Sequence, residues 1–348
     1  MHIAREKLYH SLSGVTQGIL GADIGGTNSN FGFFSYDKQT VQLIFSLHLL
    51  SKEIISFSQT IHDILDYAKT KYHFSVTHAV FAAAGIVSEK KDFCKPTNLS
   101  FVLDASDIFH ATQISYIRII NDFAAIGYGL PFLIKDDIVC IHPGVEIDKG
   151  NKAILGAGTG LGTSFLVWHE HANRYLPVAS EGGHADFVIH TEQEYHLMHF
   201  FRTCLNKSYP ISWENILSGD GIACIFHFFS LHDTTHTTAT TAPHPDEIFM
   251  HRHDNDACWK TYRTYAALYG RCAKNITLTA LARGGIYIAG GIAAKNSALF
   301  TEDVFLSEFF MNEKQQEMLM NVPIHVIINY NVSLYGAAAY LLEENSVH

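Results

Sequence analysis

Three glycine-rich turns each follow a short apolar run of the kind that forms a buried strand. They lie at Gly25-Gly26, at residues 156–162 and at Gly290-Gly291. Backbone N–H groups in such turns bind phosphate oxygens without the help of a lysine. Taken singly, each of these glycines is more often only a turn residue. Three turns at strand ends in one chain suggest a cleft lined with backbone amides and suited to a polyphosphate.

The turns match neither of the two common nucleotide-binding fingerprints. A phosphate loop of the form G-x-x-x-x-G-K-[ST] needs a lysine after its second glycine, and residues 156–164 contain none. The dinucleotide pattern G-x-G-x-x-G would need glycine at position 161 or 163, where the chain has Leu161 and Thr163. The turns therefore predict phosphate binding outside both of those patterns.

The elements around the first turn predict a mixed sheet. Residues 18–36 have the pattern strand, Gly-Gly-Thr-Asn turn, strand, because apolar runs flank residues that tolerate a positive φ. Further strands are predicted at 41–50, 78–87 and 116–120, with a helix at 54–72. Adjacent strands followed by alternating helix and strand indicate an α/β fold.

The same opening recurs in the second half of the chain, at residues 152–169. Two halves that each begin with a glycine-turn hairpin suggest a duplication around a central cleft. The periodicity that follows predicts helices at 192–205, 213–229 and 259–283, strands at 285–289 and 322–328, and a final helix at 333–344.

Residues 231–257 have an unusual composition. They are rich in Thr and His and contain Pro243 and Pro245, so they predict a polar loop inserted between helices. A metal site is the weaker interpretation, because a histidine-rich tract is a signal of composition only. The histidines concerned are His232, His236, His244, His251 and His253.

The overall composition limits the classes of partner. The chain has 348 residues, with 24 Lys and Arg against 34 Asp and Glu and a formal net charge of −10. That balance argues against a nucleic-acid footprint and against an anionic membrane surface, since both need clustered cations. No apolar run approaches the roughly 18 residues of a membrane span, and residues 1–18 lack the apolar core of a secretory signal. The six cysteines form no C-x-x-C pair, which favours reduced, mostly buried thiols in the cytoplasm.

Several motifs taken together resemble the bacterial-type ATP-dependent glucokinases, members of the hexokinase and actin-like sugar kinase superfamily. They occur in the family's order and approximate spacing between residues 18 and 342. Each motif alone is unspecific, whereas the set is highly specific. The set is Asp23-Ile24-Gly25-Gly26-Thr27-Asn28, Asn121-Asp122-Phe123, Gly156-Ala157-Gly158-Thr159-Gly160-Leu161-Gly162, Glu181-Gly182-Gly183-His184, Glu214 with Leu217-Ser218-Gly219, and Ile288-Ala289-Gly290-Gly291-Ile292.

The resemblance implies a fold and an activity. The fold would be a two-lobed α/β structure of the actin–hexokinase (duplicated ribonuclease H-like) type with a central cleft. The small domain would hold residues 1–122 and 333–348, and the large domain residues 123–332. The activity would be transfer of the γ-phosphoryl group of ATP to the 6-hydroxyl of D-glucose, with Mg²⁺, in a homodimer. The alternatives are a kinase for another hexose or an acetamido sugar, and a non-catalytic sugar-sensing regulator on the same fold.

Asp122 matches the catalytic base of that family. The acceptor hydroxyl must lose its proton as the new bond forms, and a carboxylate within hydrogen-bond reach can remove it. The same residue could instead serve as the N-cap of a helix that starts at Phe123, because Asp is a favoured cap. The sequence leaves both roles open, and they are compatible.

The resemblance also assigns the donor side of the site. Asp23 matches the carboxylate that steers Mg²⁺ through water, although an Asp in this hairpin could simply satisfy turn N–H groups. The residues expected to contact phosphates or adenosine are Gly25, Gly26, Thr27, Asn28, Gly158, Thr159, Gly160, Gly290 and Gly291.

The expected glucose ligands combine the acceptors and donors that vicinal hydroxyls need. They are Asn98, Asn121, Asp122, Glu181, His184 and Glu214. Two structural alternatives apply to this set. Residues 181–184 could be a tight turn with a solvated Glu181 and a core His184. Glu214 could be a first-turn helix residue that the helix dipole favours.

Overall fold

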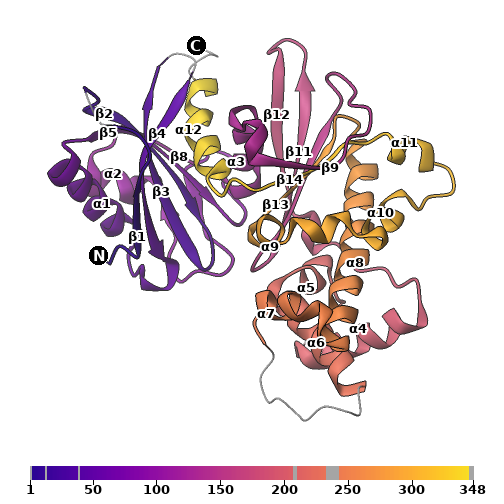
Figure 1. The fold of residues 1–348 in the computed structure, drawn as a ribbon. Helices are drawn as coiled ribbons and strands as arrows, with labels where there is room; N and C mark the ends of the chain where they lie inside the picture. Colours follow the sequence, from indigo (N-terminus) through magenta and orange to yellow (C-terminus); the bar gives the residue numbers. More distant parts are fainter. Residues whose placement is uncertain (1, 12–13, 38–39, 207–209, 233–242, 345–348) are drawn as a thin grey trace. The chain divides into compact units, whose positions relative to one another are not determined.

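The chain forms two compact units of α/β structure in a computed structural model (Figure 1). The structure describes residues 2–11, 14–37, 40–206, 210–232 and 243–344. Within them, unit 1 holds the residues up to Ile134 together with those from Asn331 onward, and unit 2 is Lys135–Tyr330. Two α/β units are what the duplicated pattern in the sequence predicts.

The sheet of unit 1 has six strands in the order β1-β4-β3-β2-β5-β8. Strands β2, β3 and β4 form an antiparallel meander, and β5 and β8 run parallel to β2. The strands are β1 (Arg5–Leu8), β2 (Gln17–Ile24), β3 (Asn28–Tyr36), β4 (Val41–Leu50), β5 (Ser75–Ala83) and β8 (Tyr116–Asn121). A mixed sheet with three adjacent strands at its start confirms the sequence prediction for this half.

Helices cover both faces of this sheet (Figure 1). On one face, α1 (Phe57–Tyr72) and α2 (Ala105–Thr112) bury a core that contains Phe31, Phe33 and Ile61. On the other face, α3 (Asp122–Gly129) and α12 (Val332–Glu344) bury a core that contains Phe34 and Ala338. Short elements complete the unit: η1 (Ser51–Glu53), the pair β6 (Phe93–Cys94) and β7 (Leu103–Asp104), and η2 (Leu130–Phe132).

The division between the units differs from the one expected from the sequence, which placed it after residue 122 and before residue 333. Helix α3 belongs to unit 1 because it packs closely on α12. A Cβ added at Gly129 would lie 2.1 Å from the carbonyl oxygen of Val332, and one added at Gly336 would lie 1.7 Å from that of Ala125. The boundary therefore lies after Ile134 and before Asn331.

Five strands of the unit 2 sheet repeat the order of five strands in unit 1, and the sixth strand, β9, pairs antiparallel with β14 at the edge opposite to that of β1. The order of the unit 2 sheet is β12-β11-β10-β13-β14-β9, with β10, β11 and β12 antiparallel and β13 and β14 parallel to β10. The strands are β9 (Ile138–His142), β10 (Lys152–Ala157), β11 (Leu161–His169), β12 (Arg174–Ser180), β13 (Ile286–Ala289) and β14 (Ile324–Ile327). An antiparallel trio followed by two parallel strands thus occurs in both units, which supports the duplication inferred from the two hairpins.

The helices of unit 2 gather around the long helix α8 (Asp256–Ala280), which buries Tyr262, Tyr265 and Tyr269. Its Arg271 is buried and donates two hydrogen bonds to Glu194 of α4 (Glu192–Cys204) and two to Glu308 of α10 (Asp303–Phe310). The remaining elements are η3 (Lys135–Asp137), η4 (Gly182–His184), α5 (Trp213–Ile216), α6 (Gly219–His232), α7 (Pro245–Met250), η5 (His251–His253), α9 (Gly291–Lys295), η6 (Ser297–Thr301) and α11 (Gln316–Met320).

The expectation of a polar loop over residues 231–257 is wrong for its second part. Residues 233–242, and with them His236, lie outside the described residues. Helix α7 starts immediately after, with Pro245 in its first turn and a capping box between His244 and Glu247. Ile248 and Phe249 of this helix are buried. The Thr- and His-rich composition concealed a helix whose start is set by a cap and whose position is set by two apolar side chains.

His325 on β14 should make the stability of unit 2 sensitive to acid. Its ring stacks on Tyr287, and its Nδ1 atom is buried without a hydrogen-bond partner. Burial lowers the pKa of His325 below the ordinary 6.5, and Glu146 opposes this only in part. Below about pH 6.5 the His325 side chain of the unfolded chain binds a proton more readily than that of the folded chain. The free energy of unfolding therefore falls as the pH drops below 6.5.

The substitution His325→Phe removes this titration while keeping an aromatic ring for the stack on Tyr287. We expect the thermal midpoint of the variant to fall less than that of the wild type between about pH 7 and pH 5. Differential scanning calorimetry across that range measures both slopes. Identical slopes would show that His325 does not contribute to the acid sensitivity.

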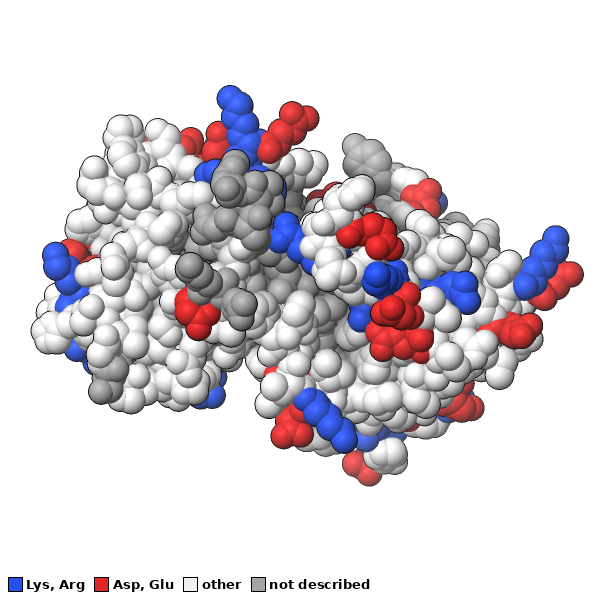
Figure 2. Space-filling view, turned by 90° about the horizontal axis from the view of Figure 1, so that it is seen from above, with Lys and Arg blue, Asp and Glu red and all other residues white. Residues whose placement is uncertain are grey.

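Charges of both signs are mixed on the face drawn in Figure 2. On this face, Lys and Arg side chains lie among Asp and Glu side chains rather than in a patch of one sign (Figure 2). The described part of the chain contains no helix that combines the length and the apolar character needed to cross a bilayer.

Candidate active site

The first glycine turn joins β2 to β3 in unit 1. The N–H of Gly25 donates to the carbonyl oxygen of Asn28 at 3.0 Å. Ser51 supports the turn from the neighbouring segment, because its Oγ donates to the carbonyl oxygen of Gly25 and its N–H to that of Thr27. Thr27 and Asn28 are exposed, so the tip of the turn is open to a ligand.

Asp23 lies on β2, two residues before this turn, opposite Asn30 of β3. Its Oδ2 accepts a hydrogen bond of 2.7 Å from Ser333 Oγ on α12. Burial raises the pKa of the Asp23 carboxyl above its ordinary value, and the hydrogen bond from Ser333 opposes that rise. The carboxylate is thus held by the last helix of the chain.

Asn121 and Asp122 stand where β8 ends and α3 begins. The N-cap is Asn121, whose Oδ1 accepts from the N–H groups of Phe123 and Ala124 at 3.0 Å each. Asp122 is the first residue of the helix, and its Oδ1 accepts from the N–H of Phe123. The interpretation of Asp122 as the N-cap is therefore wrong, because the preceding residue fills that position and leaves Asp122 inside the first turn.

These residues share one edge of the unit 1 sheet. Ile24 of β2 pairs with Ala83 of β5, and Ala83 pairs with Asn121 of β8, all in parallel register. Neighbouring strands lie about 4.8 Å apart, so the ends of β2 and β8 are separated by about 10 Å. That spacing is short enough for one ligand to contact both the first glycine turn and Asp122.

Asn98 lies beside the same turn. A Cβ added at Gly26 would lie 3.5 Å from the Cβ of Asn98. The loop that carries Asn98 also approaches Gly85, which has a φ of +138° and lies against Lys95 and Pro96. Unit 1 therefore gathers Asn98, Asp23 and the first glycine turn, while Asn121 and Asp122 lie further along the same sheet edge.

The second glycine turn, in unit 2, joins β10 to β11. Within this turn, the N–H of Gly158 donates to the carbonyl oxygen of Gly160 at 2.8 Å. Thr159, at the tip of the turn, is exposed. Glu214 lies against this turn, since its Oε2 accepts from the N–H of Leu161 at 3.1 Å. A Cβ added at Gly160 would lie 2.5 Å from that same oxygen, so a side chain at this position would displace the Glu214 carboxylate.

The other two expected sugar ligands of unit 2 lie next to Glu214. The His184 Nδ1 atom lies 3.7 Å from Glu214 Oε1, and its Nε2 atom lies 3.6 Å from Glu181 Oε2. About half of the side-chain surface of both His184 and Glu181 is exposed. His184 is therefore not a core histidine, and the three side chains form one polar cluster. Glu214 is also in the first turn of α5, so its dipole role is compatible with this contact.

The third glycine turn follows β13, which runs parallel to β10. Gly156 of β10 pairs with Ala289 of β13, so the second and third turns leave the same sheet edge on adjacent strands. Gly290 has a φ of +91°, and a Cβ added there would lie 2.5 Å from the carbonyl oxygen of Ala157. A side chain at Gly291 would meet no atom within 4 Å, which leaves open space next to this turn.

The residues present fit a magnesium ion better than a metal that needs a protein cage. The described residues include no group of three or more His, Cys, Asp or Glu side chains placed to hold a metal. Mg²⁺ usually keeps several waters and takes one or two carboxylates together with substrate phosphates. Asp23, a single carboxylate beside a glycine turn, suits that mode of binding.

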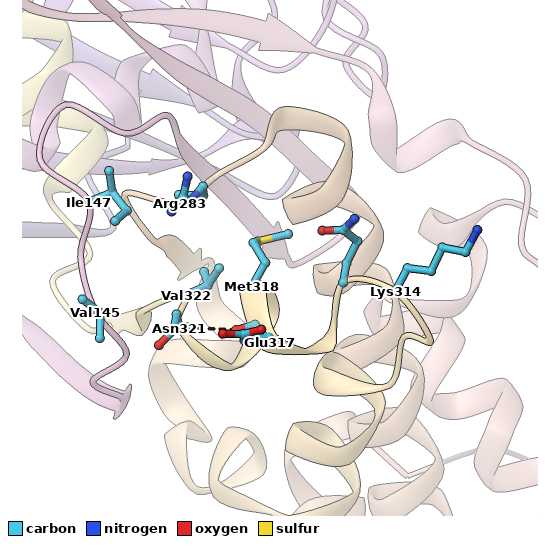
Figure 3. Close-up of a pocket in the computed structure, with 9 residues that line it drawn as sticks. Val145, Ile147, Arg283, Lys314, Glu317, Met318, Asn321 and Val322 are labelled. Atoms are coloured by element: carbon cyan, nitrogen blue, oxygen red, sulfur yellow. Dashed lines mark hydrogen bonds between the residues drawn. The ribbon is translucent and has the colours of Figure 1, made fainter.

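Two hollows on the surface lie apart from the predicted site residues. Figure 3 shows one of about 490 Å³ in unit 2, where Arg283 and Lys314 lie around the apolar side chains of Val145 and Met318. The other, of about 280 Å³, lies in unit 1 between the first turns of α1 and α2. Neither is lined by a residue that the sequence assigned to phosphate, metal or sugar.

Three supporting residues escaped the sequence analysis. Ser333 bonds to Asp23, Ser51 supports the first glycine turn, and Thr163 accepts from the N–H of Gly182 in the segment that carries Glu181 and His184. No local pattern marks them. Ser333 lies in α12, Ser51 in η1 and Thr163 in β11, and the partner of each is distant along the chain.

Comparisons with known proteins point to one family. The glucokinase family model matches residues 20–344. A glucokinase of Nostoc sp. is 32% identical over 346 residues, which cover 92% of this chain and 97% of that protein.

Solved structures show the same architecture. A glucokinase from an Antarctic psychrotroph has a TM-score of 0.76 at 26% identity, over 93% of this chain and 98% of that one. Glucokinase from Balamuthia mandrillaris in complex with glucose has a TM-score of 0.79 at 19% identity, over 94% and 93%. The fold is the duplicated α/β fold of the actin–hexokinase type, as the motifs implied. On the family match and the full-length similarity, the chain belongs to the glucokinase family.

Proposed function

We propose that this chain is an ATP-dependent glucokinase that converts ATP and D-glucose to ADP and glucose 6-phosphate. The observation that carries the proposal is the position of Glu214. Its carboxylate contacts the N–H of Leu161 at the second glycine turn and lies 3.7 Å from His184. One side chain therefore joins a backbone turn suited to phosphate with a polar cluster suited to a sugar.

The glycine turns would hold the donor. The N–H groups of Gly25 and Gly158 donate within their own turns, so other N–H groups of residues 25–28 and 158–160 would donate to the phosphate oxygens. Preorganised donors of this kind cost no reorganisation during the reaction. The open space beside Gly291 would admit the adenosine. When bound, Mg²⁺ neutralises the charge that develops on the transferred phosphoryl group, and Asp23 would orient it through water.

On the glucose side of the site, Asp122 would remove the proton of the 6-hydroxyl group. As the bond between the glucose 6-oxygen and phosphorus forms, the bond from phosphorus to the ADP oxygen breaks, and the hydroxyl proton passes to the Asp122 carboxylate. The hydrogen bond from the N–H of Phe123 to Oδ1 fixes the orientation of that carboxylate. Asn121 uses its Oδ1 in the helix cap, so its amide N–H₂ is the part left to donate to a sugar hydroxyl.

A coupled assay across a panel of sugars tests this function. Glucose 6-phosphate formation is measured with glucose, and ADP release is measured with mannose, fructose and N-acetylglucosamine. We expect the highest kcat/KM with glucose and ATP. A higher value with another hexose or with the acetamido sugar would assign the chain to that substrate instead, and no turnover with any sugar would refute the proposal.

Glu214→Gln tests the sugar cluster. Glutamine keeps the shape but loses the charge that faces His184, and a hydrogen bond to a charged group contributes about 1.5–3 kcal/mol. We therefore expect kcat/KM for glucose to fall by about 10- to 100-fold. The matched control is Glu192→Gln on α4, whose side chain is exposed and should leave the kinetics unchanged. If Glu214→Gln and Glu192→Gln had the same kcat/KM for glucose, Glu214 would not be a sugar ligand.

The assembly and the cellular location of the protein are predictions from the sequence. The family resemblance implies a homodimer, which analytical ultracentrifugation of the purified chain checks. The cysteine usage favours the cytoplasm, which fractionation of the producing cells checks.

A further inference from the structure

Two cysteines of unit 2 lie on α4 and α6, two helices that contact each other. On α4 and α6, the rings of Phe200 and Phe228 pack with centroids 5.7 Å apart. Cys204 lies four residues after Phe200, and Cys224 lies four residues before Phe228. Residues four apart lie on the same face of a helix, about 6 Å along its axis. An antiparallel arrangement of the two helices with this ring contact would therefore place the two cysteines opposite each other.

The two cysteine side chains are in contact, as that arrangement of the helices requires. The thiol of Cys224 is within hydrogen-bonding reach of the thiol of Cys204. The two residues differ in access, because Cys204 at the end of α4 is exposed and Cys224 within α6 is buried. Burial, reinforced by the neighbouring Cys204, raises the pKa of the Cys224 thiol. All six cysteines are free thiols in the structure, and the other exposed one is Cys140.

We propose that Cys204 and Cys224 form a dithiol that hydrogen peroxide converts to a disulfide between α4 and α6. The exposed Cys204 sulfur attacks one peroxide oxygen, the O–O bond breaks, and a sulfenic acid and one water form. The Cys224 sulfur then attacks the Cys204 sulfur, and the hydroxyl leaves as a second water. Two thiols lose two electrons and two protons, and the peroxide accepts both.

The order of attack follows from the environment of each thiol. Thiolates are the reactive form, so a buried thiol with a raised pKa is a poor first nucleophile toward peroxide. The exposed partner reacts first, and the buried one resolves the sulfenic acid from a position already in contact. This inference is independent of the proposed function, since it needs only the two helices.

Cys224 of the dithiol lies on α6, the helix that touches the second glycine turn. The first residue of α6 is Gly219, whose N–H donates to the carbonyl oxygen of Gly158 at 3.0 Å. Cys224 is five residues further along the same helix. The disulfide would thus join the end of α4 to the helix that supports this turn.

Peptide mapping of the full chain tests the proposal. The protein is treated with one equivalent of hydrogen peroxide, the remaining thiols are alkylated with N-ethylmaleimide, and the chain is digested with trypsin. Cleavage after Arg202, Lys207 and Arg252 places Cys204 and Cys224 in separate peptides, 203–207 and 208–252. A disulfide then appears as one linked mass that dithiothreitol separates.

Cysteine variants show which thiols the linked peptide requires. We expect the linked peptide in the wild type and, at the same rate, in Cys140→Ser, which removes the other exposed thiol. It should be absent from Cys204→Ser and Cys224→Ala, and the exposed position of Cys204 keeps the first of these folded. The proposal is overturned if Cys204 is recovered as sulfinic acid, linked to Cys140 of a second copy, or alkylated, while Cys224 is alkylated throughout.

Discussion

Replacing Asp122 with alanine is expected to lower kcat by about 10²–10⁴-fold, the range that a positioned general base contributes. The affinity for glucose should fall far less, because the other sugar ligands remain. Asn121 still caps α3 in this variant, so the helix start is preserved. Stopped coupled assays give kcat, and glucose titration of the intrinsic fluorescence gives Kd.

Two further variants separate the loss of the base from a local change in structure. Asp122→Asn keeps an oxygen that can accept from the N–H of Phe123 but cannot take a proton at neutral pH, so it should be nearly as inactive as the alanine variant. Asp66→Ala removes an exposed carboxylate from α1 and should leave kcat unchanged. Retention of most of the turnover by Asp122→Asn would show that another group accepts the proton.

The hairpins could be predicted from the sequence because their pattern is local. Apolar residues on both sides of Gly25-Gly26 and of Gly158–Gly160 specify two strands and a turn without reference to the rest of the chain. Strands β1 and β12 were not predicted, because most of their residues are exposed or half-buried and show no apolar alternation. Edge strands of this kind are set by pairing with a neighbour, which the sequence pattern does not record.

The helix cap at residues 121–122 shows where local reasoning stops. Asn and Asp are both favoured N-caps, and they stand side by side before the same helix. The choice depends on which residue has extended backbone. Asn121 has a φ of −69° and a ψ of 144° because it is the last residue of β8, so it takes the cap and Asp122 enters the helix.

Contacts between distant segments set the remainder of the site. Ser333 and Asp23 are 310 residues apart, and α12 packs directly on β2, since a Cβ added at Gly21 would lie 2.9 Å from the carbonyl oxygen of Leu334. The close packing of α12 on α3 assigns α3 to unit 1 rather than unit 2. Residue types and spacing therefore predicted which side chains could do chemistry, whereas the supporting hydrogen bonds depend on the folded arrangement.

Asp23→Asn should weaken the enzyme and stabilise the fold at the same time. As a carboxylate that orients Mg²⁺ through water, Asp23 is expected to contribute about 10- to 100-fold in apparent Mg²⁺ affinity. Mg²⁺ titration of the coupled assay measures that shift. Asp66→Ala again serves as the control, since its carboxylate is exposed and remote in sequence from the turn.

The gain in stability follows from the environment of Asp23. Its carboxyl is buried, and the hydrogen bond from Ser333 offsets the desolvation only in part, so its pKa is raised. The folded chain then binds a proton more tightly than the unfolded chain, whose carboxyl has a pKa of 3.8, and stability falls as pH rises from 3.8 through the folded-state pKa. Asparagine carries no charge and still accepts from Ser333, so at neutral pH without Mg²⁺ the free energy of unfolding should rise by about 1 kcal/mol. A lower thermal midpoint for Asp23→Asn would show that the carboxylate is compensated by groups other than Ser333.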